Sequence, residues 1–143
     1  LSTVFDQYRT VSSPAVSPNG KQMAFAFSRT QADELQYGIA VLSVDDLTVL
    51  KTLIVDIRLG TIYERPTVQW SPDGQWLYYI NYNSGVSNVW KVNVADGSTL
   101  AVTNFKAGRV YNFAYTADGT KLALARGTVD SDVVAIRLVD SIE

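Results

Sequence analysis

The chain has 143 residues, a net charge of −2 at neutral pH and a pI near 5.0. It contains no cysteine and no histidine, which excludes disulfides, cysteine metal sites and a Ser-His-Asp triad. The twelve basic residues are scattered singly, which excludes a basic surface for nucleic acid. No apolar run approaches the ~18 residues of a membrane span.

Short apolar runs bounded by Gly, Asn, Asp and Pro predict an all-β chain. A first group of strands is expected at 14–17, 21–28, 37–44 and 48–56, with a loop over 29–36. A second group is expected at 66–71, 75–81, 87–94 and 98–103. A third group is expected at 111–115, 121–126 and 132–138.

A turn of one kind opens the second strand of each group: Ser17–Gly20, Ser71–Gly74 and Thr116–Gly119. The three glycines are 54 and 45 residues apart, within the range of propeller blades or solenoid units. Asn-Gly and Asp-Gly pairs favour type I′ hairpin turns. Asp73 and Asp118 are therefore interpreted as turn residues and not as catalytic or metal-binding carboxylates.

The strands that follow these turns are apolar on both faces, with the sequences MAFAF, LYYI and LALA. Strands of this kind belong to sheets that pack face to face with neighbours on both sides. Four-stranded sheets stacked around an axis form a β-propeller. The sequence predicts three four-stranded antiparallel blades at about 10–56, 64–104 and 109–140, with residues 1–8 as a closing strand.

Several motifs resemble the WD-type propeller repeats of the TolB-like family. They are Trp70-Ser71-Pro72-Asp73-Gly74 followed by Leu77, then Asn88-Val89-Trp90 and the turn Asp96-Gly97. The first copy departs from the pattern at Asn19 and the third at Thr116-Ala117. Residues 118–137 look like the final blade of propellers appended to bacterial sensor kinases and winged-helix regulators. The resemblance implies a protein-docking platform, a sensor domain or a substrate gate.

Three blades are too few to close a propeller, which usually has four to eight. The chain begins at Leu1 and not at Met, which favours a piece of a longer protein. One interpretation is that the remaining blades of a parent propeller complete the ring. The alternative is that two copies form a homodimer with six blades, which would bury both open blade faces.

In a blade, the loops from strand two to strand three and from strand four to the next blade emerge on one face. Tyr and Arg gather there, and both are enriched at the centres of protein interfaces. The alternative is that these side chains only pack their stems at strand ends. The predicted partner-binding residues are Tyr63, Arg65, Tyr82, Arg109, Tyr111 and Arg126, with Arg29 and Asn83 on the same face.

No catalytic, cofactor-binding or metal-binding residue is predicted. The acidic pairs Asp33-Glu34, Asp45-Asp46 and Asp130/Asp132 lack the regular ligand spacing of a calcium loop and are interpreted as solvated loop charges. Among the tryptophans, Trp76 is expected to be the most exposed, because its counterparts Gln22 and Lys121 are polar.

These observations favour a non-catalytic propeller module that binds a protein or peptide, within a larger bacterial sensor or envelope protein. The expected location is periplasmic or otherwise extracytoplasmic. One alternative is the gating propeller of a prolyl oligopeptidase-type hydrolase, whose catalytic residues would lie elsewhere. Another is a carbohydrate-binding or carbohydrate-processing propeller, which needs an acidic pair facing an exposed aromatic such as Trp76.

Overall fold

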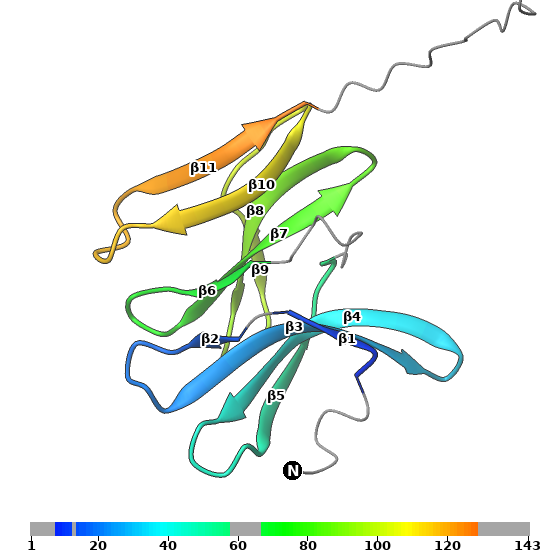
Figure 1. The fold of residues 1–143 in the computed structure, drawn as a ribbon, viewed down its shortest axis with the longest axis vertical. Coiled ribbons are helices and arrows are strands. Elements are labelled where there is room, and N and C mark those ends of the chain that lie inside the picture. Colours follow the sequence, from blue (N-terminus) through cyan, green and yellow to red (C-terminus); the bar gives the residue numbers. More distant parts are fainter. Residues whose placement is uncertain (1–7, 13, 58–66, 129–143) are drawn as a thin grey trace, which may run out of the picture.

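A computed structural model describes residues 8–12, 14–57 and 67–128. Three antiparallel β-sheets follow one another along the long axis, as the sequence predicts, and we call them blades 1, 2 and 3 (Figure 1). Some predicted features lie outside the described residues: residues 1–7, the expected strand at 132–138, and the predicted partner-binding residues Tyr63 and Arg65.

The first two blades have the strand order expected of propeller blades. In blade 1 the strands are β1 (Thr10–Val11), β2 (Ala15–Val16), β3 (Gln22–Gln31), β4 (Glu34–Ser43) and β5 (Val49–Ile54). Both β1 and β2 pair with β3, and together they occupy the place of one innermost strand. In blade 2 the strands are β6 (Val68–Trp70), β7 (Trp76–Asn83), β8 (Val86–Asn93) and β9 (Thr99–Ala101). Blade 3 begins with β10 (Arg109–Tyr115) and β11 (Leu122–Gly127).

The loop expected over 29–36 is instead a continuation of the hairpin between β3 and β4. Arg29 pairs with Gln36, and the ladder continues to the last pair, Gln31 with Glu34. The turn consists of Ala32 and Asp33, whose φ angles are +49° and +63°. A two-residue turn with positive φ at both positions matches the strand twist, so the strands pair to their ends.

The three repeat turns share one pattern of hydrogen bonds, shown here for the second copy. The Gly74 amide donates to the Ser71 carbonyl (2.9 Å), and the Ser71 amide donates to the Trp76 carbonyl (2.9 Å). The Ser71 hydroxyl donates to Asp73 Oδ1 (2.5 Å), which also accepts the Gln75 amide (3.0 Å). The side chain of Asp73 therefore holds its own turn.

These turns are not the two-residue type I′ turns expected from the sequence. Only the glycines Gly20, Gly74 and Gly119 have positive φ, from +69° to +72°, whereas a type I′ turn needs positive φ at both central positions. Four residues separate Ser71 from Trp76, so the turn is a four-residue hairpin loop whose third residue is a left-handed glycine.

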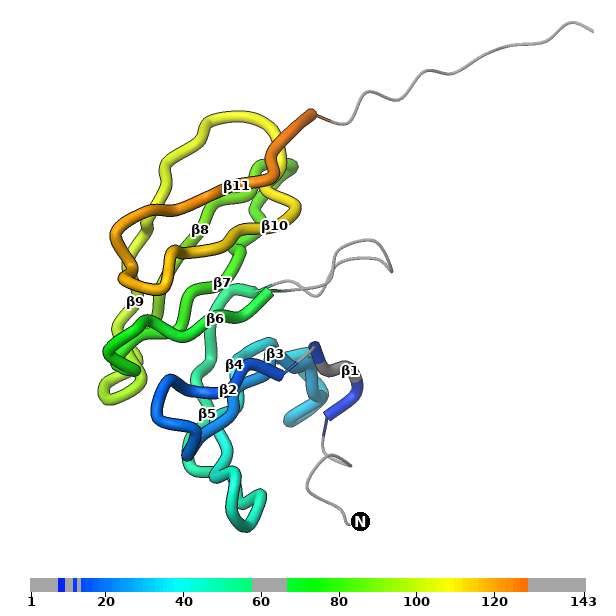
Figure 2. The backbone as a smooth tube through the Cα atoms, turned by 60° about the vertical axis from the view of Figure 1, so that its left-hand side comes forward, coloured from blue at the N-terminus to red at the C-terminus, as the bar shows by residue number. Residues whose placement is uncertain are grey.

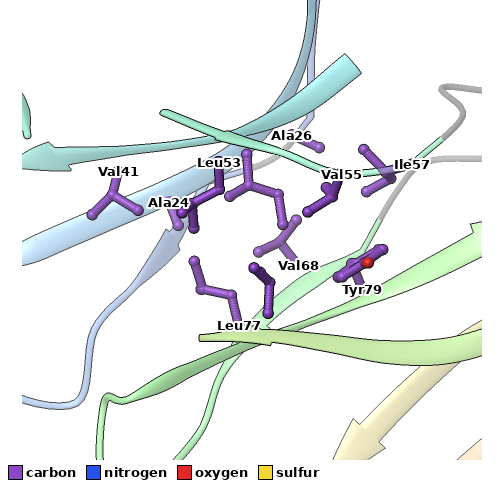
Figure 3. Packing of buried hydrophobic residues seen from close by; sticks show 11 residues of the cluster. Ala24, Ala26, Val41, Leu53, Val55, Ile57, Val68, Leu77 and Tyr79 are labelled. Carbon is purple, nitrogen blue, oxygen red and sulfur yellow. The ribbon is translucent and has the colours of Figure 1, made fainter. Parts of the chain in front are cut away.

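The largest buried cluster lies between blades 1 and 2 (Figure 3). Blade 1 presents Ala24 and Ala26 of β3, and blade 2 presents Leu77 and Tyr79 of β7. The four side chains are 0–1% exposed, and burial of a side chain such as leucine stabilises a fold by about 1.5–3 kcal/mol. Small residues on one sheet therefore leave room for large residues on the next.

The opposite face of β7 packs against blade 3. Tyr78 and Ile80 lie against Val110 and Phe113 of β10, and the Tyr78 and Tyr115 rings stand 4.2 Å apart between centroids. Successive residues of β7 thus contact different blades, which confirms for this strand the expected burial on both faces. In β11 the expectation is not met, because Ala123 and Ala125 are exposed.

Blade 3 presents exposed small residues on its outer face. Ala123 and Ala125 occupy the repeat positions of Ala24 and Ala26, which blade 2 covers in blade 1. Completion of the ring by further blades or by a second copy stays a prediction.

The second and third repeat turns each lie close to the turn of the preceding blade. A Cβ built on Gly119 would lie 3.0 Å from Pro72 Cγ, and one on Gly74 would lie 3.9 Å from Pro18 Cδ. No atom lies within 4 Å of a Cβ built on Gly20. The glycine of one turn therefore stacks on the proline of the turn before it.

This contact predicts that Gly119→Ala destabilises the fold more than Gly20→Ala does. Both substitutions place alanine in the left-handed region, at about 1–2 kcal/mol each. Gly119→Ala adds the clash with Pro72, so its loss of unfolding free energy in urea should exceed that of Gly20→Ala by about 1 kcal/mol. Equal losses for the two variants would contradict the stacking of the turns.

Candidate protein-binding surfaces

The strands of each blade have two ends, and different loops join the strands at each of them (Figure 1). The turn end, on the left of Figure 1, carries the three repeat turns. The loop end, on the right, carries the β3–β4 and β7–β8 turns and the start of β10. The structure describes four of the six predicted partner-binding residues. All four lie in strands, at or near the loop end: Tyr82, Arg109, Tyr111 and Arg126.

Aromatic rings support two of the arginines at the loop end. The Arg109 guanidinium lies 4.9 Å from the centroid of the Tyr82 ring, and the Arg126 guanidinium lies 4.2 Å from that of Phe105. Arg126 also donates a hydrogen bond to the Ala107 carbonyl. Stacking on a ring restrains a long side chain and leaves its charge at the surface.

Tyr111 is the most exposed aromatic residue of this group. Val110 pairs with Arg126 and Asn112 pairs with Ala125, so Tyr111 is the extra residue of a β-bulge. Bulges change the direction of a side chain, and the Tyr111 side chain is 45% exposed. The bulge was not expected from the sequence.

The segment that leads into β10 is held to blade 2 by side-chain hydrogen bonds. Asn88 Oδ1 accepts the Phe105 amide (2.6 Å) and the Thr103 hydroxyl (2.9 Å), and Asn88 Nδ2 donates to the Phe105 carbonyl (3.2 Å). The buried Ser87 hydroxyl accepts the Val110 amide (2.5 Å). Strand β8 thus fixes the position from which the loop-end side chains project.

The turn end contains a groove that the sequence interpretation missed. Its volume is about 470 Å³, and it spans the first strands of all three blades, β2, β6 and β10, which Figure 2 shows one above another. The lining residues carry no charge: Ala15, Val16, Pro18, Gln69, Trp70, Pro72, Tyr115, Thr116 and Ala117. Trp70 and Tyr115 are half-buried and pack against the clusters between the blades, and each also forms part of the groove wall.

The tyrosines beside this groove are neutral at physiological pH. Burial, followed by interactions with Tyr78, raises the pKa of Tyr115 to about 12. Burial also raises the pKa of Tyr78. Neither phenol can therefore act as a base near pH 7.

Trp76 is half-buried, and Lys91 Nζ lies 4.3 Å from the centroid of its ring. A sugar that stacked on this ring would compete with the lysine for the same π-face. Within the described ranges, no group of three or more His, Cys, Asp or Glu side chains is placed to hold a metal ion. Those ranges also contain no helix long and apolar enough to cross a membrane.

The turn carboxylates have lowered pKa values because they accept hydrogen bonds. The hydroxyl of Thr116, and next the backbone and hydroxyl of Thr120, lower the pKa of Asp118 to about 2. The Ser71 hydroxyl is the largest cause of the lowered pKa of Asp73. The depressed folded pKa of Asp118 stabilises the fold above the ordinary value of 3.8, and this contribution is lost as pH falls through about 2.

Comparison with known proteins points to one kind of propeller. No family model matches the chain. The chain is 31% identical over 74 residues to the Tol-Pal system protein TolB of Francisella tularensis. The matched stretch covers 52% of this chain and 17% of the relative. Its fold matches TolB from Acinetobacter baumannii with a TM-score of 0.62 and 22% identity, over 90% of this chain and 29% of that one. The chain contains TolB-like propeller repeats.

Two further structures place the TolB-like chain within the wider propeller fold. A putative TolB from Agrobacterium tumefaciens matches with a TM-score of 0.61 and 20% identity, over 89% of this chain and 42% of that one. The acylaminoacyl peptidase of Pyrococcus horikoshii matches with a TM-score of 0.57 and 15% identity, over 85% of this chain and 18% of that one. At these identities the likeness shows the fold alone. The chain spans 17% to 42% of the length of these TolB proteins.

The hydrogen bonds of the third TolB-like turn give a prediction for the pKa of Asp118. Thr116→Val removes the strongest hydrogen bond to the carboxylate, so the pKa should rise from about 2 towards 3.8. Thr120→Val leaves the Thr120 amide in place and should raise it less. A pH titration of the Asp118 carboxyl carbon by NMR measures both, and a larger rise in Thr120→Val would contradict the assignment.

Proposed function

We propose that this chain is a non-catalytic propeller segment that binds a protein partner through its loop end. The observation that carries the proposal is the arrangement of Tyr82, Arg109, Tyr111 and Arg126 at one end of adjoining strands. Tyr and Arg supply most of the binding energy in many protein interfaces. Tyr63 and Arg65, which the sequence also predicts as partner-binding residues, lie outside the described residues.

The rigidity of the loop end supports this function. Asn88 and Ser87 tie the segment before β10 to blade 2, and the aromatic rings restrain the two arginines. A surface that is already ordered loses less conformational entropy when a partner binds. Affinity can then come from a small number of exposed side chains.

The proposed partner is a protein of the bacterial cell envelope. The Francisella relatives are named as TolB proteins of the Tol-Pal system, and we extend that setting to this chain. The corresponding location is periplasmic. The likeness to a peptidase propeller rests on the fold alone, whereas the likeness to TolB is also seen in the sequence, so a hydrolase gate is the less favoured candidate.

A binding experiment with purified Pal protein, from the bacterium that encodes this chain, tests the proposal. Arg109→Ala combined with Tyr111→Ala should weaken binding at least ~10-fold, because each substitution truncates a predicted contact residue. Leu100→Ala combined with Lys121→Ala is the matched control, since both residues are exposed and lie away from the loop end. Biolayer interferometry gives the dissociation constants.

Two results would contradict parts of this proposal. Equal affinities for the loop-end variant and the wild-type chain would exclude the loop end as the binding surface. A wild-type chain that does not bind Pal would exclude Pal as the envelope partner. Circular dichroism of each variant checks that the β-fold is retained.

A further inference from the structure

The groove at the turn end lies at the opposite end of the blades from the proposed partner surface, and it has a distinct chemistry. Apolar and aromatic side chains form most of its walls: Pro18 and Pro72 come from the turns, Trp70 and Tyr115 from the innermost strands, and Val16 is 60% exposed. No lining residue is charged. A ligand for this groove is therefore recognised mainly by apolar contact.

The polar side chains that line the groove are engaged by the protein itself. Gln69 Nε2 donates to the Phe113 carbonyl (2.9 Å), and Gln69 Oε1 accepts the Tyr115 amide (3.4 Å). Trp70 Nε1 donates to the Ala15 carbonyl (2.9 Å), and the Thr116 hydroxyl donates to Asp118. The bonds of Gln69 and Trp70 join neighbouring blades, and the bond of Thr116 lies within its own turn. A ligand therefore cannot use the same groups without breaking these bonds.

This arrangement discriminates between kinds of peptide. A peptide amide that enters an apolar groove without a hydrogen-bond partner is penalised by about 1–3 kcal/mol. Proline has no amide hydrogen, and a proline-rich segment is already extended in solution. Grooves lined by aromatic side chains bind such segments in several protein families. The lining therefore favours a proline-rich peptide over an ordinary strand.

The negatively charged Asp118 is not part of the lining but adjoins it in the chain. Asp118 follows the lining residue Ala117 directly, and its lowered pKa keeps it ionised at neutral pH. Asp73 follows Pro72 in the same way, but Lys91 lies close enough to contribute to its lowered pKa. The blade 3 end of the groove is therefore the better place for a cation on the ligand.

We infer that the turn-end groove binds an extended, proline-rich peptide segment with a basic residue next to the prolines. The proline rings lie against Pro18, Pro72, Trp70 and Tyr115, and the basic side chain lies near Asp118. This surface is separate from the loop end, so the chain has two surfaces for two different partners. The inference about the groove is independent of the protein partner proposed for the loop end.

The experiment uses the full chain and synthetic peptides with blocked ends. The probe has five prolines followed by arginine, and isothermal titration calorimetry measures its dissociation constant. A peptide in which alanine replaces every proline should bind at least ~10-fold more weakly, because it presents unpaired amides and a flexible backbone. Equal binding of the two peptides would overturn the inference.

Two variants test the position of the peptide. Ala117→Gln places a larger neutral side chain in the groove wall and should weaken binding ~10-fold, because the added atoms occupy space that the peptide needs. Ala101→Gln makes the same change at an exposed position of β9, outside the groove, and should leave binding unchanged. A loss of binding in Ala101→Gln, or none in Ala117→Gln, would overturn the assignment.

Asp118→Asn tests the charge without removing the turn. Asn19 occupies the same repeat position in the first turn and makes the equivalent bonds to Ser17 and Lys21. The variant should bind the arginine probe ~3-fold more weakly, as expected for loss of an exposed ion pair, and should bind a glutamine-ended probe as the wild type does. An unchanged arginine probe would exclude the basic residue from the ligand.

A second copy of the chain is the competing occupant. Sedimentation equilibrium of the wild type and Ala117→Gln distinguishes it, because a groove filled by another copy gives a dimer that the substitution dissociates. That result would overturn the inference of a peptide ligand and show that a second copy of the chain occupies the groove.

Discussion

The structure depends on the need of each blade to bury two apolar faces. In blade 2, alternate residues of one strand point to opposite neighbours: Leu77 and Tyr79 to blade 1, Tyr78 and Ile80 to blade 3. The pleat of a strand makes this alternation unavoidable. A central blade cannot exist alone in water, because either face without a neighbour would expose a sheet of large side chains. Stability is thus a property of pairs of blades.

Complementary side-chain size accompanies this pairing. Ala24 and Ala26 bring blade 1 close to the large residues of blade 2, while at the next interface tyrosine rings from both sides share the space. Side chains also connect the inner strands, since Trp70 bonds to Ala15 and Gln69 to Phe113. The same inner strands form the walls of the groove. Blade packing and the shape of the groove therefore have a common cause.

Much of the fold could be predicted from the sequence because its signals are local. Apolar runs and recurring turns locate the strands of the first two blades to within a few residues. The hairpin at Ala32-Asp33 was missed because its positive-φ turn contains no glycine. The type I′ assignment was wrong because it ignored the side chain of Asp73, which accepts bonds across a longer loop.

The candidate sites were only partly predictable, for a different reason. Blade connectivity is enough to bring Tyr82, Arg109, Tyr111 and Arg126 to one end, because it decides where each strand begins and ends. The bulge at Tyr111 and the groove beside Trp70 and Tyr115 arise from packing between blades. A repeat position that reads as core in one blade can also form the wall of a groove between blades.

The stacking of each turn glycine on the preceding proline has a geometric consequence for the assembly. The contact lies at one end of the blades, whereas the buried cores lie along their faces. Two separate contacts between neighbours restrain both their distance and their tilt. In a ring, an error in tilt is added once for every blade and appears in full where the last blade meets the first. Small residues in these turns thus help to set the curvature that decides whether a ring can close.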